Sequence, residues 1–128
     1  MNLLLDTHTI LWALTDDDAR LSRRAREAIL SPSNQKFVCL ASAWELAIKV
    51  SNGKLYFEGG VDNFMHQVDN SNFLTLPIER SHIARIESLP YHHRDPFDRL
   101  LVAAALCEGL AIVTADEHIP AYGVPCVW

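Results

Sequence analysis

Three consecutive leucines, Leu3 to Leu5, stand near the start of the chain and are followed directly by the carboxylate of Asp6. A continuous apolar run is typical of a central parallel strand buried on both faces, whereas a half-exposed strand alternates apolar and polar residues. In open α/β sheets, functional groups gather just outside the carboxyl ends of the strands. The run therefore predicts a central strand with Asp6 at its functional end. The alternative role for Asp6 is to cap the helix that follows.

Short apolar segments and helical segments alternate along the rest of the chain. Further strands are predicted at residues 36–40, 72–76, 110–113 and 125–128. Helices are predicted at residues 7–14, 23–30, 42–52, 61–68, 78–89 and 96–108. This alternation indicates a parallel sheet with right-handed crossovers and helices on both faces. We therefore expect one domain over residues 1–128, an α/β protein of three α/β/α layers around a parallel sheet of four to five strands.

Several helix boundaries carry local signals. The segment Ser42-Ala43-Trp44-Glu45 matches a capping box, in which Ser42 would cap a helix and Glu45 would bond back to it. Asp95 suits a cap and Pro96 the first helical position of the alanine-rich helix, which Gly109 ends. In the helix before it, Ile83 is expected to face inward. The acidic triplet at residues 16–18 is interpreted as a solvated turn.

The composition excludes several classes of protein. The chain has 128 residues, of which 49% are hydrophobic, and this favours a globular domain. Because no apolar run approaches the roughly 20 residues of a membrane span, and no basic segment precedes the first apolar run, we expect neither a membrane helix nor a signal peptide. Cys39, Cys107 and Cys126 are widely spaced, which indicates buried free thiols in a reducing cytoplasm. The formal charge of −5 does not by itself indicate a nucleic-acid binder.

Four carboxylates are predicted to meet at one edge of the sheet. Asp6, Glu45 and Asp116 follow the first, second and fourth strands, and the carboxyl ends of parallel strands share an edge. Asp98 opens the helix that leads into the fourth strand. Each acid has a structural alternative: a cap for Asp6, the capping box for Glu45, the helix dipole for Asp98 and a turn for Asp116.

Carboxylates gathered in this way raise one another's pKa, and a hard divalent cation relieves the repulsion. Oxygen ligands favour Mg²⁺ or Mn²⁺, as one ion or two, whereas His92 and His93 lack the spacing of a zinc site and are interpreted as solvated loop residues. Such a site suits hydrolysis of phosphodiester bonds. Two divalent cations would change the formal charge from −5 to −1. The candidates for phosphate contact are Arg94, Arg99 and Lys49.

Four segments of the chain also carry a family resemblance. They are LLLDTHTILWAL near the start, ASAWELAIKVSNGKL in the middle, HHRDPFDRLLVAAAL, and IVTADEHI near the end. Together they cover nearly the full length, and in this order and spacing the chain resembles the PIN-domain ribonucleases, in particular the VapC-type toxins of type II toxin–antitoxin pairs. The resemblance implies a PIN fold and an endoribonuclease that depends on Mg²⁺ or Mn²⁺.

The resemblance places the catalytic and metal-binding acids at Asp6, Glu45, Asp98 and Asp116, and a polar position that orders the metal or its waters at Thr114. Asp95 matches the same segment as Asp98 and is interpreted as the helix cap. The family implies an RNA substrate, a small antitoxin protein that covers the site, and a homodimer. Exposure of Trp12, Leu14 and Trp44 would fit such contacts, although burial in the core is the favoured reading.

Other functions fit parts of this pattern. A phosphorelay receiver also has acids at strand ends, but it needs an acceptor aspartate after the third strand and a lysine after the fifth, which the chain does not supply. An inactive PIN-like binding module, a housekeeping ribonuclease without an antitoxin, and a DNA nuclease remain as alternatives, because the metal chemistry does not distinguish the sugar.

Overall fold

A parallel sheet forms the centre of the structure, a computed structural model that describes residues 1–15 and 17–128. In the described part of the chain the sheet has five strands in the order β3-β2-β1-β4-β5, and every pair of neighbours is parallel. The strands are β1 (Asn2–Leu5), β2 (Gln35–Cys39), β3 (Leu74–Leu76), β4 (Ala111–Val113) and β5 (Cys126–Val127). The predicted central position of the first strand is confirmed.

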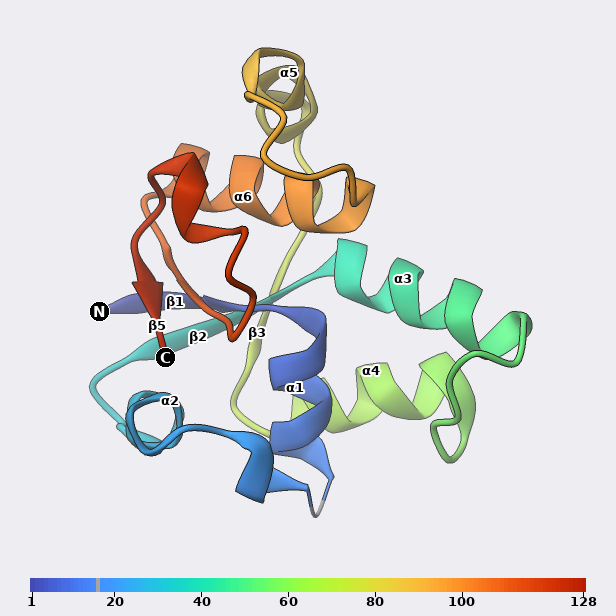
Figure 1. Cartoon of the computed structure of the whole chain (residues 1–128). Coiled ribbons are helices and arrows are strands. Elements are labelled where there is room, and N and C mark those ends of the chain that lie inside the picture. The colour runs from blue at the N-terminus through green and yellow to red at the C-terminus, as the bar shows by residue number, and fades with distance from the viewer. Residues whose placement is uncertain (16) are drawn as a thin grey trace.

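Helices cover both faces of this sheet, so the predicted three-layer α/β/α architecture is confirmed (Figure 1). The α-helices are α1 (Thr7–Leu14), α2 (Arg23–Leu30), α3 (Leu40–Ser51), α4 (Gly60–Asn70), α5 (Arg80–Ser88) and α6 (Pro96–Glu108). The described residues also form two short 3₁₀ helices, η1 (Asp18–Arg20) and η2 (Pro120–Tyr122). Helix α6 lies on the sheet with α5 outside it, while α1, α2 and α4 lie on the opposite face.

The leucine run of β1 supplies both layers of the core. Leu3 and Leu5 pack into the cluster that contains α1, α2 and α4, whereas Leu4 packs into the cluster that contains α6. All three side chains are fully buried. Successive residues of a strand point to opposite faces, so an unbroken apolar run is what a strand covered on both sides requires.

The start of α3 differs from the prediction. The helix begins at Leu40, immediately after β2, and Cys39 is its cap, with Sγ accepting a hydrogen bond from the Ala41 amide at 3.4 Å. Ser42 therefore lies inside the first turn, and the capping-box interpretation is wrong. The reason is that Leu40 and Ala41 are apolar residues that suit a strand and a helix equally, so the periodicity does not mark the boundary.

Several predicted side-chain environments are also corrected. Ile83 is 58% exposed, whereas its neighbour His82 is the residue of α5 that is fully buried. Trp44 is exposed and meets Phe97 edge-on, while Trp12 and Leu14 are half-buried. All three cysteines are free, but Cys39 alone is buried.

Two further predictions concern the acidic triplet and membrane helices. Residue 16 of the triplet lies outside the described residues, and its neighbours Asp17 and Asp18 are exposed, as expected of a solvated segment. None of the described helices has the length and apolar character that a membrane span requires.

Candidate metal centre

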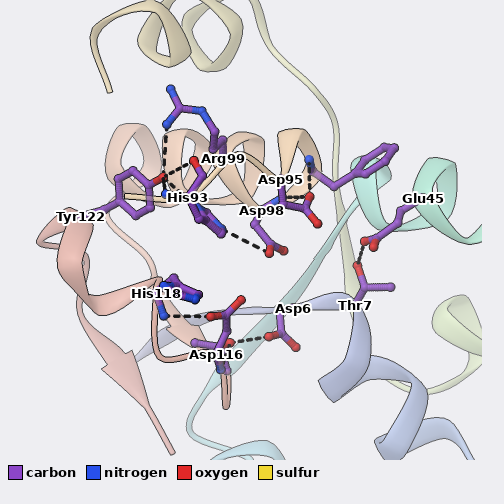
Figure 2. A network of polar contacts seen from close by, with 12 residues as sticks. Asp6, Thr7, Glu45, His93, Asp95, Asp98, Arg99, Asp116, His118 and Tyr122 are labelled. Carbon is purple, nitrogen blue, oxygen red and sulfur yellow. Dashed lines mark hydrogen bonds and ion pairs between the residues drawn. The ribbon is translucent and has the colours of Figure 1, made fainter. Parts of the chain in front are cut away.

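A cavity of about 350 Å³ opens at the carboxyl edge of the sheet, and acidic side chains dominate its wall. The acids that line it are Asp6, Glu45, Asp95, Asp98 and Asp116. They come from the end of β1, from α3, from the start of α6 and from the segment after β4, as Figure 2 shows. The structure thus brings together at one cavity the four carboxylates that were selected from the sequence, and Asp95, the supporting candidate, lines the same cavity.

Asp6 combines the two roles that the sequence offered. Its Oδ1 accepts a hydrogen bond from the Thr9 amide at 2.8 Å, which caps α1, while Oδ2 accepts one from the Thr114 hydroxyl. The Thr114 oxygen in turn accepts from the amide of Asp116 at 3.0 Å. The side chain of Asp6 is buried apart from the part that faces the cavity. Thr114 therefore links the end of β1 to the segment that carries Asp116.

Glu45 lies in the second turn of α3, and its carboxylate is held on both sides. Oε1 accepts a hydrogen bond from the Thr7 hydroxyl at 2.7 Å, and Oε2 forms an ion pair of 2.8 Å with Lys49 one turn later. The Thr7 oxygen also lies 3.0 Å from the hydroxyl of Ser42. The hydrogen bond to Glu45 is the main cause that raises the pKa of Lys49. Thr7 and Ser42, which sequence reasoning did not select for the site, fix the rotation of Glu45.

Asp95 and Asp98 are fixed by the start of α6. Oδ1 of Asp95 accepts hydrogen bonds from the amides of Phe97 and Asp98, at 2.9 and 3.1 Å, so the predicted cap is confirmed. The ring of Phe97 packs edge-on against Trp44 of α3, with centroids 5.0 Å apart. This aromatic contact holds the first turn of α6 beside α3, and so sets the position of Asp98 relative to Glu45.

The environment of Asp98 disfavours the charged form of its carboxyl group. Burial, followed by the negative charges of Asp95, Asp116, Glu45 and Asp6, raises the pKa of Asp98 to about 8. Without a counter-charge this group therefore holds a proton at neutral pH. A cation with a preference for carboxylate oxygen would displace that proton and relieve the repulsion. The donor set fits Mg²⁺ or Mn²⁺ in charge and in atom type.

His93 is corrected from a solvated loop residue to a half-buried part of this site. Its Nε2 lies 3.3 Å from Oδ2 of Asp98, and its Nδ1 lies 2.8 Å from the hydroxyl of Tyr122. A ligand atom of His93, one of Asp98 and one of Asp116 all lie within 4.8 Å of one another. The ring of His118 stacks on His93 from the solvent side. His92, in contrast, is exposed as predicted.

The sequence pattern contained no reliable signal for His93, because the loop before α6 has no periodicity that assigns a direction to its side chains. Tyr122 was likewise missed. It stands in the short 3₁₀ helix η2, 29 residues after His93.

Arg99 does not face the cavity. Its guanidinium is buried and donates to the carbonyl oxygens of residues 86, 89 and 90 and to the hydroxyl of Tyr122. It also lies over the ring of Tyr91, 4.0 Å from the centroid. The prediction that Arg99 contacts a phosphate is therefore corrected. Lys49 lines the cavity, and Arg94 is exposed.

The fold and the site together define an α/β protein with an acidic centre at the carboxyl edge of a parallel sheet. Residues 3–125 match the family model of the PIN domain. The chain therefore belongs to the PIN-domain family, as the four sequence segments indicated. No curated protein matches the chain in sequence.

Solved structures share this fold at low sequence identity. VapBC2 from Rickettsia felis, bound to a promoter DNA fragment, has a TM-score of 0.70 at 15% identity, covering 98% of this chain and 97% of that one. DNA-bound VapBC from Salmonella typhimurium also gives 0.70 at 15% identity, with 98% and 96% covered. FitAcB from Neisseria gonorrhoeae gives 0.58 at 18% identity, with 97% and 95% covered. At these identities the likeness is one of fold.

Proposed function

We propose that the protein is a metal-dependent endoribonuclease that hydrolyses RNA phosphodiester bonds with Mg²⁺ or Mn²⁺. The observation that carries the proposal is the convergence of Asp6, Glu45, Asp98 and Asp116 on one cavity, where burial and mutual repulsion raise the pKa of Asp98 to about 8. Repulsion among these carboxylates is unfavourable in the metal-free protein, and a bound cation would relieve it. Membership of the PIN-domain family supports the same activity.

In this proposal the four acids would hold one ion or two, with Thr114 ordering Asp6. A divalent ion there supplies charge neutralisation at the phosphate and lowers the pKa of the attacking water. Thr7 and Lys49 hold the Glu45 carboxylate in one orientation, because both donate hydrogen bonds to it. We propose that Lys49 and Arg94 contact substrate phosphates. Lys49 lines the cavity, and Arg94 is exposed and directly precedes the lining residue Asp95 in the sequence.

The experiment that tests this proposal is cleavage of a structured RNA by the purified chain, separated from any bound protein. We expect endonucleolytic products with Mg²⁺ or Mn²⁺, and no products when EDTA removes the ion. A single-stranded DNA of the same sequence serves as the control for the sugar. Cleavage that continues in EDTA would contradict the metal centre, while preferential cleavage of the DNA would favour a deoxyribonuclease.

We further propose that the protein is a cytoplasmic toxin with a small antitoxin partner and that it forms a homodimer. The support is the fold that it shares with VapBC and FitAcB structures, whose names denote toxin–antitoxin complexes or their components. A housekeeping ribonuclease and an inactive PIN-like module are the alternatives.

The test of the toxin role is expression in a bacterial host. We expect growth to stop when the chain is expressed alone and to resume when the small protein encoded next to it is co-expressed. Continued growth, with soluble protein that cleaves RNA in vitro, would instead favour a housekeeping nuclease.

A further inference from the structure

His93 is linked to the acidic cavity on one side and to a buried polar network on the other (Figure 2). The hydroxyl of Tyr122 lies 2.8 Å from Nδ1 of His93 and also accepts a hydrogen bond from the His93 amide at 3.3 Å. On the other side of the ring, Nε2 lies 3.3 Å from Oδ2 of Asp98. The His93 side chain is 11% exposed, so its ring is confined between these two partners.

The network is anchored by the buried charge of Arg99. Nη1 donates to the carbonyl of Pro90 at 2.8 Å and to the Tyr122 hydroxyl at 3.2 Å, and Nη2 donates to the carbonyl of Leu89 at 3.3 Å. A guanidinium can donate but cannot accept, so each of these contacts has a fixed direction. The Tyr122 oxygen is therefore an acceptor toward Arg99.

These directions determine which nitrogen of His93 carries the proton. The Tyr122 oxygen already accepts from Arg99 and from the His93 amide, so the hydroxyl proton must be donated elsewhere. Nδ1 of His93 at 2.8 Å is a much better acceptor than the His93 carbonyl at 3.4 Å. In a neutral imidazole with Nδ1 as acceptor, the proton lies on Nε2. Nε2–H therefore points at Oδ2 of Asp98.

We infer that His93 is a positioning residue of the proposed metal centre, in which its Nε2–H holds Asp98 while Tyr122 and Arg99 fix its tautomer. The inference rests on the proposed function. Carboxylates that bind metals are commonly held by hydrogen bonds of their own, and loss of such a partner typically weakens metal binding by roughly 10–100-fold. His93 occupies that place beside Asp98, whereas Thr114 and Thr7 occupy it beside Asp6 and Glu45.

The same geometry argues against His93 as a direct ligand of the ion. Ligation by Nε2 would require its proton to move to Nδ1. Nδ1–H would then face a Tyr122 oxygen that already accepts two hydrogen bonds, and the hydroxyl proton would be left with the distant carbonyl of His93. The network would lose the 2.8 Å hydrogen bond from the Tyr122 hydroxyl to Nδ1, so the structure assigns an orienting role to this ring.

Binding of Mn²⁺ to the purified full chain, followed by electron paramagnetic resonance of the free ion, tests the inference without any RNA. His93→Phe keeps an aromatic ring but cannot donate, and its dissociation constant for Mn²⁺ should rise roughly 10–100-fold. His93→Gln has an amide N–H near the position of Nε2 and should stay within about threefold of the original chain. The matched control is His92→Phe at the exposed neighbour, whose aromatic ring keeps the edge-on contact with Tyr122 and which should bind normally.

Tyr122→Phe provides a second variant, since it keeps the buried ring and removes the hydroxyl that holds Nδ1. It should weaken Mn²⁺ binding by roughly three- to tenfold, less than His93→Phe, because the ring of His93 remains and loses its preferred tautomer. Pulsed electron paramagnetic resonance of Mn²⁺ bound to the original chain should show no nitrogen bonded directly to the ion.

The inference would be overturned by normal Mn²⁺ binding in His93→Phe and Tyr122→Phe, or by a directly bonded nitrogen that disappears in His93→Phe. Those outcomes would leave the proposed function intact, since the original chain would still bind the ion. If the original chain itself bound no Mn²⁺, the metal centre would fail, and the role of His93 would fail with it.

Discussion

Asp98→Asn and Asp6→Asn should each lower RNA cleavage by roughly a thousandfold, which exceeds the 10–100-fold typical of a residue that only orients a metal ligand. Each substitution removes a charged oxygen donor from the cavity while it keeps the size and shape of the side chain. Asparagine also caps helices well, so Asp6→Asn retains the hydrogen bond to the Thr9 amide and the start of α1. The fold should therefore persist in both variants.

The measurement is the rate of RNA cleavage at saturating Mg²⁺, with circular dichroism to verify the fold. Asp69→Asn is the matched control, because Asp69 is exposed in the last turn of α4 and the substitution changes the charge equally. It should cleave at the original rate. If Asp98→Asn or Asp6→Asn retained full activity, the acids would be misassigned, and another group in the cavity would have to carry the reaction.

The convergence of these acids could be predicted because topology alone requires most of it. Strands β1, β2 and β4 are parallel, so Asp6, Glu45 and Asp116, which follow them, must approach one edge. Helix α6 leads into β4 and runs back along the sheet, so its first turn, with Asp98, begins at that same edge. The exact rotation of Glu45 could not be predicted, because it depends on where α3 starts.

The burial of Arg99 could have been inferred from the apolar residues that follow it in the sequence. Residues 100–106 form an almost continuous apolar segment, and a helix that is apolar on all sides is buried on all sides. Helix α6 indeed lies between the sheet and α5, so a charge in its first turns had to be buried and paired. The partners of Arg99 are carbonyl oxygens at the end of α5 and in the loop that follows. These partners could not be predicted from the sequence.

The direction of His93 could not have been predicted in this way. It belongs to the loop between α5 and α6, where each side chain is directed by its particular contacts. His93 contacts Asp98 and Tyr122, and the Tyr122 hydroxyl in turn accepts a hydrogen bond from Arg99, whose orientation is itself set by the tertiary structure. The direction of a side chain in such a buried network can be assigned only from the tertiary structure.

The stability of the metal-free protein should fall as the pH rises from about 4 to about 8, and Asp98→Asn should abolish most of this fall. The pKa of Asp98 is about 8 in the folded chain, whereas its ordinary value is 3.8. Between these values the unfolded chain has released the proton and the folded chain has kept it. Fewer protons are bound in the unfolded state, so the free energy of unfolding decreases with pH across this window and is unaffected by this group above it.

Asparagine resembles the protonated form at every pH, so Asp98→Asn should match the original chain near pH 4 and exceed its free energy of unfolding by ~5 kcal/mol at pH 8. Urea denaturation in EDTA over this range measures the difference, with Asp69→Asn as control. A divalent ion at about 100 times its dissociation constant should narrow this difference, because it stabilises the original chain by ~2.7 kcal/mol. Parallel pH curves for the two proteins would show that Asp98 ionises normally. In that case the acidic cavity would not hold the unfavourable charge that a metal ion is proposed to neutralise.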